Sequence, residues 1–575
     1  MFKSKGCLFV FVIMVAGFIG GCKDESDPGY WAKKVKEPAF REQATKMLGE
    51  LYNQALEKAK LNENDPEVIK VRDQVVPVLL DTFNKYKTDN INRSNILAIL
   101  ARIADERAIP AFEELLDYQE GINETDASKG AEALGVLGSD ASIPKIVGMV
   151  KKAQVARKSR GEGSRNRPEE DWIMRSAIAA LQAILIKKPN TSNRQEALNV
   201  LISVMETTAD EQDFFLNMKA ASALGDIGDP AAVPILIRGL FMQGRGATIY
   251  QQCRVALCKI AIEHRAQVMD GLLQAYKGED KALEEDAVKY AFIQGVKEDK
   301  IGRIFAELGV TEQHILDEMM KRLADPDPAV SGFTAISLGQ IGYAPALDEM
   351  IKMITAKDAQ LGTIPGIVEA FEYYQAPKKT SEILFNMMTD KEKWDRTYRL
   401  RSALALSKIA GGEYLDPYQK AVSEEEDEEV RKEMVEFTER FQAAKECGED
   451  TGCWLGKLND SSWRIQEKAL FTLLRKTEAI TPDKVNDVTA LMRSTNQDVL
   501  KVMFMLVKNL HPGGCQPSKT CDRLKKIIPY WRAKPQFKVR ANDAESLLAI
   551  LLQRQGGKLA DLHAGGAVPA EAEAD

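Results

Sequence analysis

The sequence predicts an all-α protein, an α-solenoid built from repeated pairs of antiparallel helices. Ala, Leu, Glu and Lys are plentiful among the 575 residues and aromatic residues make up 7%, a mixture that favours helices. Apolar residues recur at helical spacing, as at Ala220, Ala223, Leu224 and Ile227. The phrase that contains them returns along the chain, mostly at intervals of 31 to 36 residues. A pair of helices cannot bury both apolar faces alone, so stacked neighbours must supply the core.

The clearest repeat, residues 220–240, reads AASALGDIGDPAAVPILIRGL. Gly228-Asp229-Pro230 is predicted to end the first helix, and Val233-Pro234 to open the second. The same phrase recurs at 131–147, and it recurs more loosely at 96–115, 335–350 and 403–418. We expect one buried apolar anchor in each first helix: Leu48, Leu100, Leu134, Leu181, Leu224, Leu257, Phe292, Leu338, Phe371, Leu406, Phe437, Leu473 and Leu506.

This phrase resembles the HEAT repeat, in particular the short HEAT-like form rich in ALGxIGDPxAVP. The resemblance covers about residues 31–510 and is close in two or three units. It implies a curved superhelix of HEAT or armadillo type that binds another protein on its concave face. Short HEAT-like units also occur in bilin lyases, which would require a bilin partner, and in DNA-glycosylase-like proteins, which would require a basic groove.

The first 22 residues resemble the signal of a bacterial lipoprotein. Lys3 and Lys5 precede an apolar run over residues 8–19, which is too short to span a membrane. The run ends in Ile-Gly-Gly-Cys22, which is similar to a lipobox. The resemblance implies cleavage before Cys22 and acylation of Cys22, which would anchor the mature chain in a membrane. An ordinary signal peptide cut near Gly21 is the alternative.

The residues after the cysteine bear on location and charge. Lys23, rather than Asp, follows Cys22, which favours the outer membrane, with the protein facing the periplasm. Loss of the signal leaves 76 basic against 85 acidic residues, a net charge of about −9. This acidity gives no reason to expect nucleic acid as a partner.

Composition and the repeats together predict five segments. We expect a signal peptide over 1–21, a lipidated tether over 22–30 and the repeat solenoid over 31–445. C-terminal helical repeats with two local disulfides would follow over 446–555, and a disordered low-complexity tail over 556–575.

Two cysteine pairs lie near the C-terminus. Cys447 and Cys453 bracket one polar loop, and Cys515 and Cys521 bracket another. In an exported protein such local pairs are expected to form disulfides, each worth about 2 kcal/mol. A zinc site that uses both pairs and His511 is the alternative, although the spacing departs from C-x₂-C.

The remaining residues offer little chemistry. Cys253 and Cys258 lie about 140° apart on one predicted helix and are expected to be buried free thiols. Metalloprotease, nucleophile-elbow, P-loop and dinucleotide motifs are absent from the sequence. Residues 142–145 match S-x-x-K, but at the turn of a repeat and without K-T-G, which indicates coincidence. We therefore expect no enzyme, cofactor or small-molecule substrate.

Residues 151–167 carry seven basic residues against one Glu and are predicted to be an inserted loop. A solvated loop is one interpretation, and a contact with an anionic partner such as lipid headgroups or cell-wall polymer is the other. The candidate contact residues are Lys151, Lys152, Arg157, Lys158, Arg160, Arg165 and Arg167. The acidic run 424–429 is expected in the first turn of a helix, with calcium binding as the alternative.

These observations predict a lipid-anchored envelope protein that binds another envelope protein as a scaffold or assembly factor. The alternative is a non-catalytic regulator that activates an envelope enzyme, such as a cell-wall synthase. In either case the acyl anchor would raise the effective concentration of the binding surface at the membrane.

Overall fold

The computed structural model describes residues 25–119, 123–159, 168–206, 215–244, 247–285, 294–516 and 518–563. Over these residues the chain is helical apart from one hairpin of two short strands, which confirms the all-α class. It divides into two compact units, one up to Val200 and one from Leu201 onward, and each is described by itself. Within the described residues the structure has no helix that is both long and apolar enough to cross a membrane.

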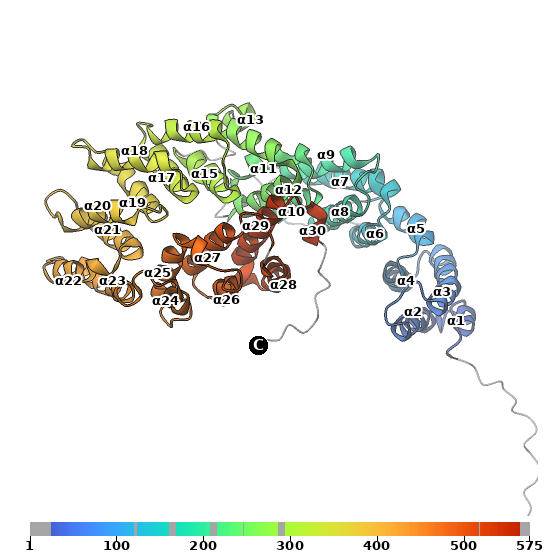
Figure 1. Cartoon of the computed structure of the whole chain (residues 1–575). Coiled ribbons are helices and arrows are strands. Elements are labelled where there is room, and N and C mark those ends of the chain that lie inside the picture. The colour runs from blue at the N-terminus through green and yellow to red at the C-terminus, as the bar shows by residue number, and fades with distance from the viewer. Residues whose placement is uncertain are drawn as a thin grey trace, which may run out of the picture. The chain divides into compact units, whose positions relative to one another are not determined.

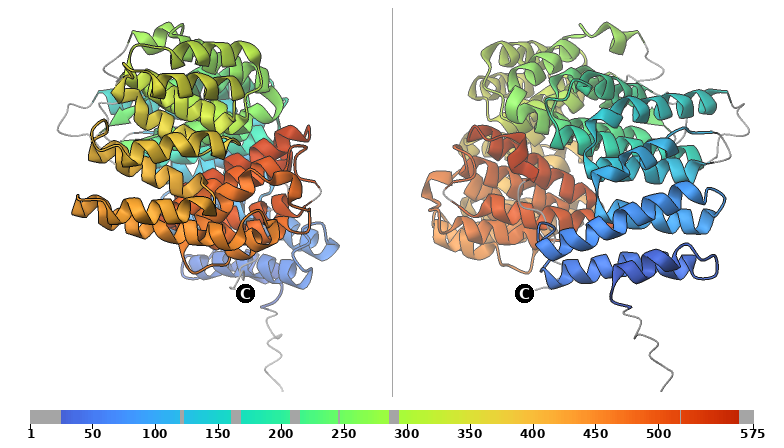
Figure 2. Two further views of the ribbon diagram at one scale, coloured as in Figure 1. Left: turned by 60° about the vertical axis from the view of Figure 1, so that its left-hand side comes forward. Right: turned by 90° about the vertical axis from the view of Figure 1, so that its right-hand side faces the viewer.

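Unit 1 stacks its helices in antiparallel pairs (Figure 2). Its elements are α1 (Pro28–Lys34), α2 (Arg41–Lys58), α3 (Pro66–Lys85), α4 (Asn90–Ile103), η1 (Glu106–Ala108), α5 (Ile109–Leu115), α6 (Glu124–Leu137), η2 (Asp140–Ser142), α7 (Ile143–Lys158) and α8 (Pro168–Lys187). The first helices α2, α4, α6 and α8 contact one another in order. Helix α9 (Arg194–Glu206) spans the division between the units.

Unit 2 continues the same pattern and ends with three C-terminal helices. Its elements are α10 (Phe215–Ile227), η4 (Pro230–Ala232), α11 (Val233–Gly239), β1 (Gln243–Gly244), β2 (Ala247–Thr248), α12 (Tyr250–Lys277), α13 (Lys281–Glu284), α15 (Val296–Leu308), α16 (Gln313–Leu323), α17 (Pro328–Ile341), α18 (Ala344–Thr355), η5 (Leu361–Thr363), α19 (Ile364–Phe371), α20 (Pro377–Thr389), α21 (Arg396–Ile409), η6 (Gly412–Tyr414), α22 (Leu415–Ser423), α23 (Glu428–Cys447), α24 (Thr451–Lys457), α25 (Trp463–Leu474), η7 (Thr477–Ala479), α26 (Val485–Ala490), η8 (Leu491–Arg493), α27 (Gln497–Leu510), α28 (Thr520–Arg532), η9 (Pro535–Phe537), α29 (Lys538–Arg554) and α30 (Leu559–His563).

The predicted turn between the two helices of a repeat is confirmed at α10 and α11. Gly228 has φ +73°, which a residue with a side chain rarely adopts, and follows the last residue of α10. The Asp229 carboxylate then accepts a hydrogen bond of 3.0 Å from the Ala231 N–H. Pro230 and Pro234 occupy early helical positions, where no backbone N–H is needed.

The predicted anchors fall on successive first helices. All except Phe292 are buried, and they lie on α2, α4, α6, α8, α10, α12, α17, α19, α21, α23, α25 and α27. Phe292 lies outside the described residues, and α15 is the first helix of that repeat. Helix α29 continues the series beyond the last predicted anchor, because it packs on α27.

The chain of unit 2 curls back on itself. In Figure 1 the helices pass from green through yellow and orange and return in red, where α29 packs along α12. The second helices α16, α18, α20 and α22 lie along the outer edge of this unit, and the first helices line its inner side (Figure 1). The HEAT resemblance implied a partner on the concave face, and in unit 2 α27 and α29 lie on that side.

Several expected boundaries differ in the structure. Helix α1 already begins at Pro28, so the segment before the repeats is shorter than the predicted 22–30. Residues 559–563 form α30, which packs on α12, so the predicted disorder is wrong for these five residues. Residue 445, where we expected the solenoid to give way to C-terminal repeats, lies inside α23.

Candidate functional site

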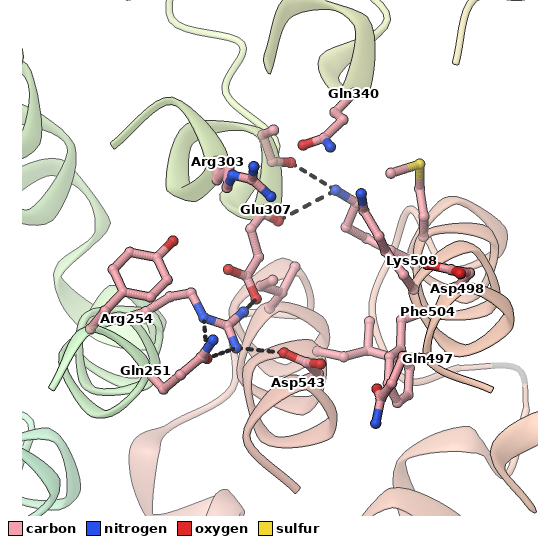
Figure 3. Close-up of a pocket in the computed structure, with 16 residues that line it drawn as sticks. Gln251, Arg254, Arg303, Glu307, Gln340, Gln497, Asp498, Phe504, Lys508 and Asp543 are labelled. Atoms are coloured by element: carbon pink, nitrogen blue, oxygen red, sulfur yellow. Dashed lines mark hydrogen bonds and ion pairs between the residues drawn. The ribbon is translucent and has the colours of Figure 1, made fainter. Parts of the chain in front are cut away.

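Unit 2 contains a cavity of about 350 Å³ at the place where its last helices meet its first ones. Helices α12, α15 and α17 supply one side, and α27 and α29 supply the other (Figure 3). We call it the seam cavity. Its lining residues are Tyr250, Gln251, Arg254, Arg303, Ala306, Glu307, Gln340, Gln497, Asp498, Lys501, Phe504, Met505, Lys508, Asp543, Leu547 and Ile550.

Arg254 joins three helices at one wall of the cavity. Its guanidinium lies 2.5 Å from the Glu307 carboxylate of α15 and 2.6 Å from the Asp543 carboxylate of α29. The Gln251 side chain accepts a further hydrogen bond of 2.8 Å. Burial raises the pKa of Asp543, and Arg254 opposes that rise. Because Arg254 engages two carboxylates, its own charge is offset within the wall.

Lys508 reaches across the cavity from α27 to the end of α15. Its Nζ donates to the Ala306 carbonyl at 2.8 Å and lies 3.5 Å from the Glu307 carbonyl. These carbonyls belong to the last turn of α15, where the helix dipole favours a cation. Burial lowers the pKa of Lys508 to about 8, with Glu307 opposing that shift and Arg554 adding to it.

A second ion cluster fastens α29 to α12. The Lys259 ammonium lies 2.6 Å from Asp226 and 2.7 Å from Glu545, and both Lys259 and Glu545 are buried. Further along, the Leu559 N–H donates to the Glu263 carboxylate at 3.1 Å. A Cβ atom on Gly228 would lie 2.3 Å from the Leu559 side chain, so this contact requires glycine there.

A smaller cavity of about 240 Å³ lies between α19, α21, α25 and α27 and shares Asp498 and Lys501 with the seam cavity. Lys408 projects into it, 3.0 Å from Glu372 and 3.5 Å from Glu467. Burial raises the pKa of Glu372, which Lys408 counteracts. Charged side chains therefore line the inner side of unit 2 along α27 as well as at its closing end.

The structure joins both predicted cysteine pairs. Cys447 and Cys453 form a disulfide with Cα atoms 5.4 Å apart, and Cys515 and Cys521 form one with Cα atoms 5.6 Å apart. The thiols that a zinc site would use are thus paired with each other. The His511 ring nitrogens lie 2.8 Å from the Val507 carbonyl and 2.6 Å from the hydroxyl of Ser518.

The free cysteines behave as predicted, since Cys253 and Cys258 are both buried and unbridged. Burial raises the pKa of each thiol, which keeps both in the neutral form. The predicted lipidation residue Cys22 lies outside the described residues.

The basic segment differs from the expected loop over its first half. Residues 151–158 form the last two turns of α7 rather than an insertion. Lys152 pairs with Asp117 at 2.7 Å and Arg157 with Asp171 at 2.9 Å, so these two cations already have intramolecular partners. Lys151 is exposed, and Lys158 closes the helix. Arg160, Arg165 and Arg167 lie outside the described residues.

The acidic run 424–429 meets α23 as a capping segment. Asp427 is the N-cap and accepts from the backbone N–H groups of Glu429 and Val430, and Glu428 and Glu429 form the first turn. The partner of Glu425 is Arg399, in a buried ion pair with α21. The expected place in a first turn is confirmed for Glu428 and Glu429 only.

Sequence reasoning did not find the seam cavity. Its residues come from segments separated by more than two hundred positions, and no repeat pattern states that α29 returns to α12. One signal was present, because Arg254 directly follows Cys253, whose side chain the sequence predicts to be buried. A charge on such a face requires a partner, although the sequence does not say which one.

The fold and the seam define a helical-repeat protein whose second unit closes on its own C-terminal helices. Residues 218–241, which cover most of α10 and all of α11, match the PBS lyase HEAT-like repeat, so the HEAT resemblance is shown for this repeat. None of the curated proteins matches the chain in sequence.

Solved structures with a similar arrangement of helices include three HEAT-repeat proteins. The structure of Kap121p bound to Pho4p is 12% identical over 92% of this chain, with a TM-score of 0.45. Importin beta matches at 12% identity over 92% of this chain and 74% of its own, with a TM-score of 0.29. The Pds5–Scc1 complex matches at 12% identity over 85% of this chain and 76% of its own, with a TM-score of 0.26. The chain spans 63% of the Kap121p chain.

Proposed function

We propose that the chain is a lipid-anchored, non-catalytic scaffold that binds another envelope protein through unit 1. The helical-repeat fold is one that presents extended surfaces to protein partners. Unit 2 cannot offer its inner side in this way, because its own C-terminal helices lie there. The binding surface is therefore assigned to the unit whose apolar side chains remain exposed.

The exposed apolar side chains of unit 1 carry this proposal. Among the described residues of unit 1, seven large apolar side chains are exposed: Phe40, Leu61, Ile91, Val136, Val155, Trp172 and Ile186. The described part of unit 2, although longer, exposes four: Leu361, Val435, Tyr530 and Val539. Large aromatic and aliphatic side chains on the surface of a folded unit mark candidate protein interfaces.

Two of these residues form the centre of the proposed surface. Val155 lies on α7 and Trp172 on α8, and the ion pair between Arg157 and Asp171 joins the two helices beside them. We call Val155 and Trp172 the α7–α8 patch. Tryptophan is enriched among interface residues that dominate binding energy, and exposed Lys151, one turn before Val155 on α7, adds a positive charge beside the patch.

The proposed acyl anchor on Cys22 would hold unit 1 close to the membrane. The Trp31 indole donates to the Glu25 carbonyl at 2.8 Å, which fixes the chain from Glu25 onward. Glu25 follows Cys22 by three positions, a reach of roughly 10 Å when extended. The first helices would then lie at the membrane surface. The proposed location is the outer membrane, with the protein facing the periplasm.

The anchor and the surface are tested separately. Cys22→Ala should move the protein from the membrane fraction to the soluble periplasmic fraction, and persistent membrane association would contradict the anchor. Detergent-solubilised envelope should yield one stoichiometric partner with the wild-type chain. Val155→Ser/Trp172→Ala should lose that partner, whereas the matched unit 2 variant Val435→Ser/Val539→Ser should keep it. Equal retention by both variants would contradict the surface.

A regulator of a cell-wall enzyme is the second candidate function, because the α7–α8 patch can equally bind an enzyme. The two candidates differ in what the partner does. We would add the wild-type chain and the variant Val155→Ser/Trp172→Ala to the purified partner and measure its turnover. A severalfold change with the wild-type chain but not with the variant favours the regulator. A partner with constant turnover or no activity favours the scaffold.

A further inference from the structure

The seam cavity has the size and lining of a ligand site. Pockets of about 300 to 1,000 Å³ with an apolar body and a few polar groups are typical for small organic ligands, and the cavity holds about 350 Å³. Phe504, Leu547 and Ile550 are buried side chains that border it, and Met505 is half-buried. The apolar part of a guest would find contact there.

The charges around the cavity are unevenly distributed. Arg254 already engages Glu307 and Asp543, two of the three carboxylates in the lining. The third carboxylate, Asp498, is exposed at the rim. Three lining cations remain, which are Arg303, Lys501 and Lys508.

The hydrogen bonds of two of these cations, Arg303 and Lys508, leave space beside each charged group for an anion. Arg303 uses its Nε to donate to Asp299, one turn away on α15, at 2.6 Å. The oxygens that the described residues offer to Lys508 Nζ are backbone carbonyls rather than carboxylates. Figure 3 shows Arg303, Gln340 and Lys508 along one side of the cavity and Arg254 with Asp543 along the other. Donors from α15, α17 and α27 thus border one part of the space.

We propose that the seam cavity binds a small amphipathic carboxylate, with its anionic group between Arg303 and Lys508 and its apolar body against Phe504, Leu547 and Ile550. An arginine binds a carboxylate through two parallel hydrogen bonds, and a lysine adds a point charge. The same ligand would touch both α15 and α27, so it would strengthen the closure of unit 2. This site is independent of the partner surface proposed on unit 1.

Three probes with one apolar body separate charge from hydrophobic contact. They are 4-phenylbutyrate, 4-phenylbutan-1-ol and 4-phenylbutylammonium, titrated calorimetrically at pH 7 into the soluble Cys22→Ala full chain. The carboxylate should bind once per chain, about tenfold or more tightly than the alcohol or the ammonium compound. Equal binding of acid and alcohol would show a merely apolar cavity and overturn the proposal, as would no binding of any probe.

Variants locate the probe. Lys508→Met and Arg303→Gln should each weaken 4-phenylbutyrate by about tenfold, and Met505→Trp should block it by filling the cavity. Lys526→Met makes the same chemical change at an exposed lysine of α28 and should leave binding unchanged. Wild-type affinity in Arg303→Gln and Met505→Trp would refute the site even if Lys508→Met fails to fold, which a melting curve would reveal.

The pH profile adds an independent readout. The groups that face Lys508 are Glu307 of α15, Arg554 of α29 and the Cys258 thiol of α12. Since the pKa of Lys508 is about 8, its charge is lost as the pH rises from 7 to 9. Binding of 4-phenylbutyrate should weaken over this range in the wild type and stay constant in Lys508→Met. A flat wild-type profile would remove Lys508 from the site.

Discussion

The two units of this chain share a repeat and differ in where they place their charges. In unit 1 several ion pairs are exposed, as in Lys87 with Glu114, whose side chains are 65% and 49% accessible. In unit 2 several are buried, as in Arg440 with Glu467, which are 1% and 3% accessible. Exposed pairs contribute little to stability, whereas a buried pair that loses one member leaves an uncompensated charge. Unit 2 should therefore depend on its ion pairs far more than unit 1.

Breaking a buried pair tests this difference most strongly. Arg440→Met would leave the Glu467 carboxylate buried, with Lys408 at 3.5 Å as its remaining cation. We expect a loss of about 3 to 5 kcal/mol from the unfolding free energy of unit 2. Lys87→Met in unit 1, which removes the exposed pair with Glu114, should cost less than about 1 kcal/mol. Urea unfolding followed by hydrogen exchange would assign each loss to its unit.

The outcome for α25 and α27 distinguishes a local from a global effect. Exchange should accelerate in Arg440→Met over these helices and stay unchanged in unit 1. Equal losses for Arg440→Met and Lys87→Met would mean that burial of the pair does not set its importance, and the contrast between the units would fail.

The sequence revealed the repeats because their information is local. Leu224, Gly228 and Pro230 lie close together in the sequence, at the end of α10 and the start of η4. Helix spacing, a glycine in the left-handed region and a proline together specify the turn between the two helices. The same logic placed the anchors on their helices even where the phrase is diffuse. It also fails predictably, because Lys151 and Lys152 appeared in a polar stretch and yet continue α7.

The closure of unit 2 could not be read in this way. Lys259 and Glu545 lie in helices almost three hundred positions apart, and each alone resembles a charge on a solvated face. Only the return of α29 to α12 brings them together, and that return depends on the small rotation added by every repeat between them. The seam cavity inherits this difficulty, since two distant parts of the chain line it.

A disulfide provides the second test, within unit 2 alone. The bond between Cys447 and Cys453 joins the end of α23 to α24, and the Trp454 indole donates to the Gly448 carbonyl at 2.9 Å inside the same loop. Cys447→Ala/Cys453→Ala should lower the unfolding free energy by about 2 kcal/mol. Differential scanning calorimetry would detect a lower melting temperature for unit 2 and an unchanged one for unit 1.

A matched control is Cys253→Ala/Cys258→Ala, which removes two free buried thiols. Adding a reductant should lower the melting temperature of this variant and of the wild type. The reductant should lower the melting temperature less in the variant without Cys447 and Cys453, which retains only the disulfide between Cys515 and Cys521. Identical responses of all three proteins would show that the first disulfide does not stabilise unit 2.

The third test concerns Lys468, a buried amine of unit 2 whose hydrogen-bond acceptor is a backbone carbonyl. Lys468 Nζ donates to the Ala410 carbonyl at 2.5 Å, and Arg475 donates to the adjacent Ile409 carbonyl at 3.2 Å, both at the end of α21. Burial lowers the pKa of Lys468 well below its usual range, Arg475 and Arg440 lower it further, and Glu413 opposes them. The folded protein therefore holds this amine in its neutral form over a range in which the unfolded chain protonates it.

The sign of the pH effect follows from that proton. Between the folded pKa and the ordinary value of about 10.4, the unfolded chain binds one proton more, so stability rises with pH by up to about 1.4 kcal/mol per unit. Lys468→Met should remove this pH dependence, and it should stabilise unit 2 most at the low end of this pH range. Urea midpoints at pH 7, 8 and 9 would show the gap between variant and wild type narrowing as the pH rises. The exposed control Lys526→Met should run parallel to the wild type, and a constant gap for Lys468→Met would mean that Lys468 is charged in the folded protein.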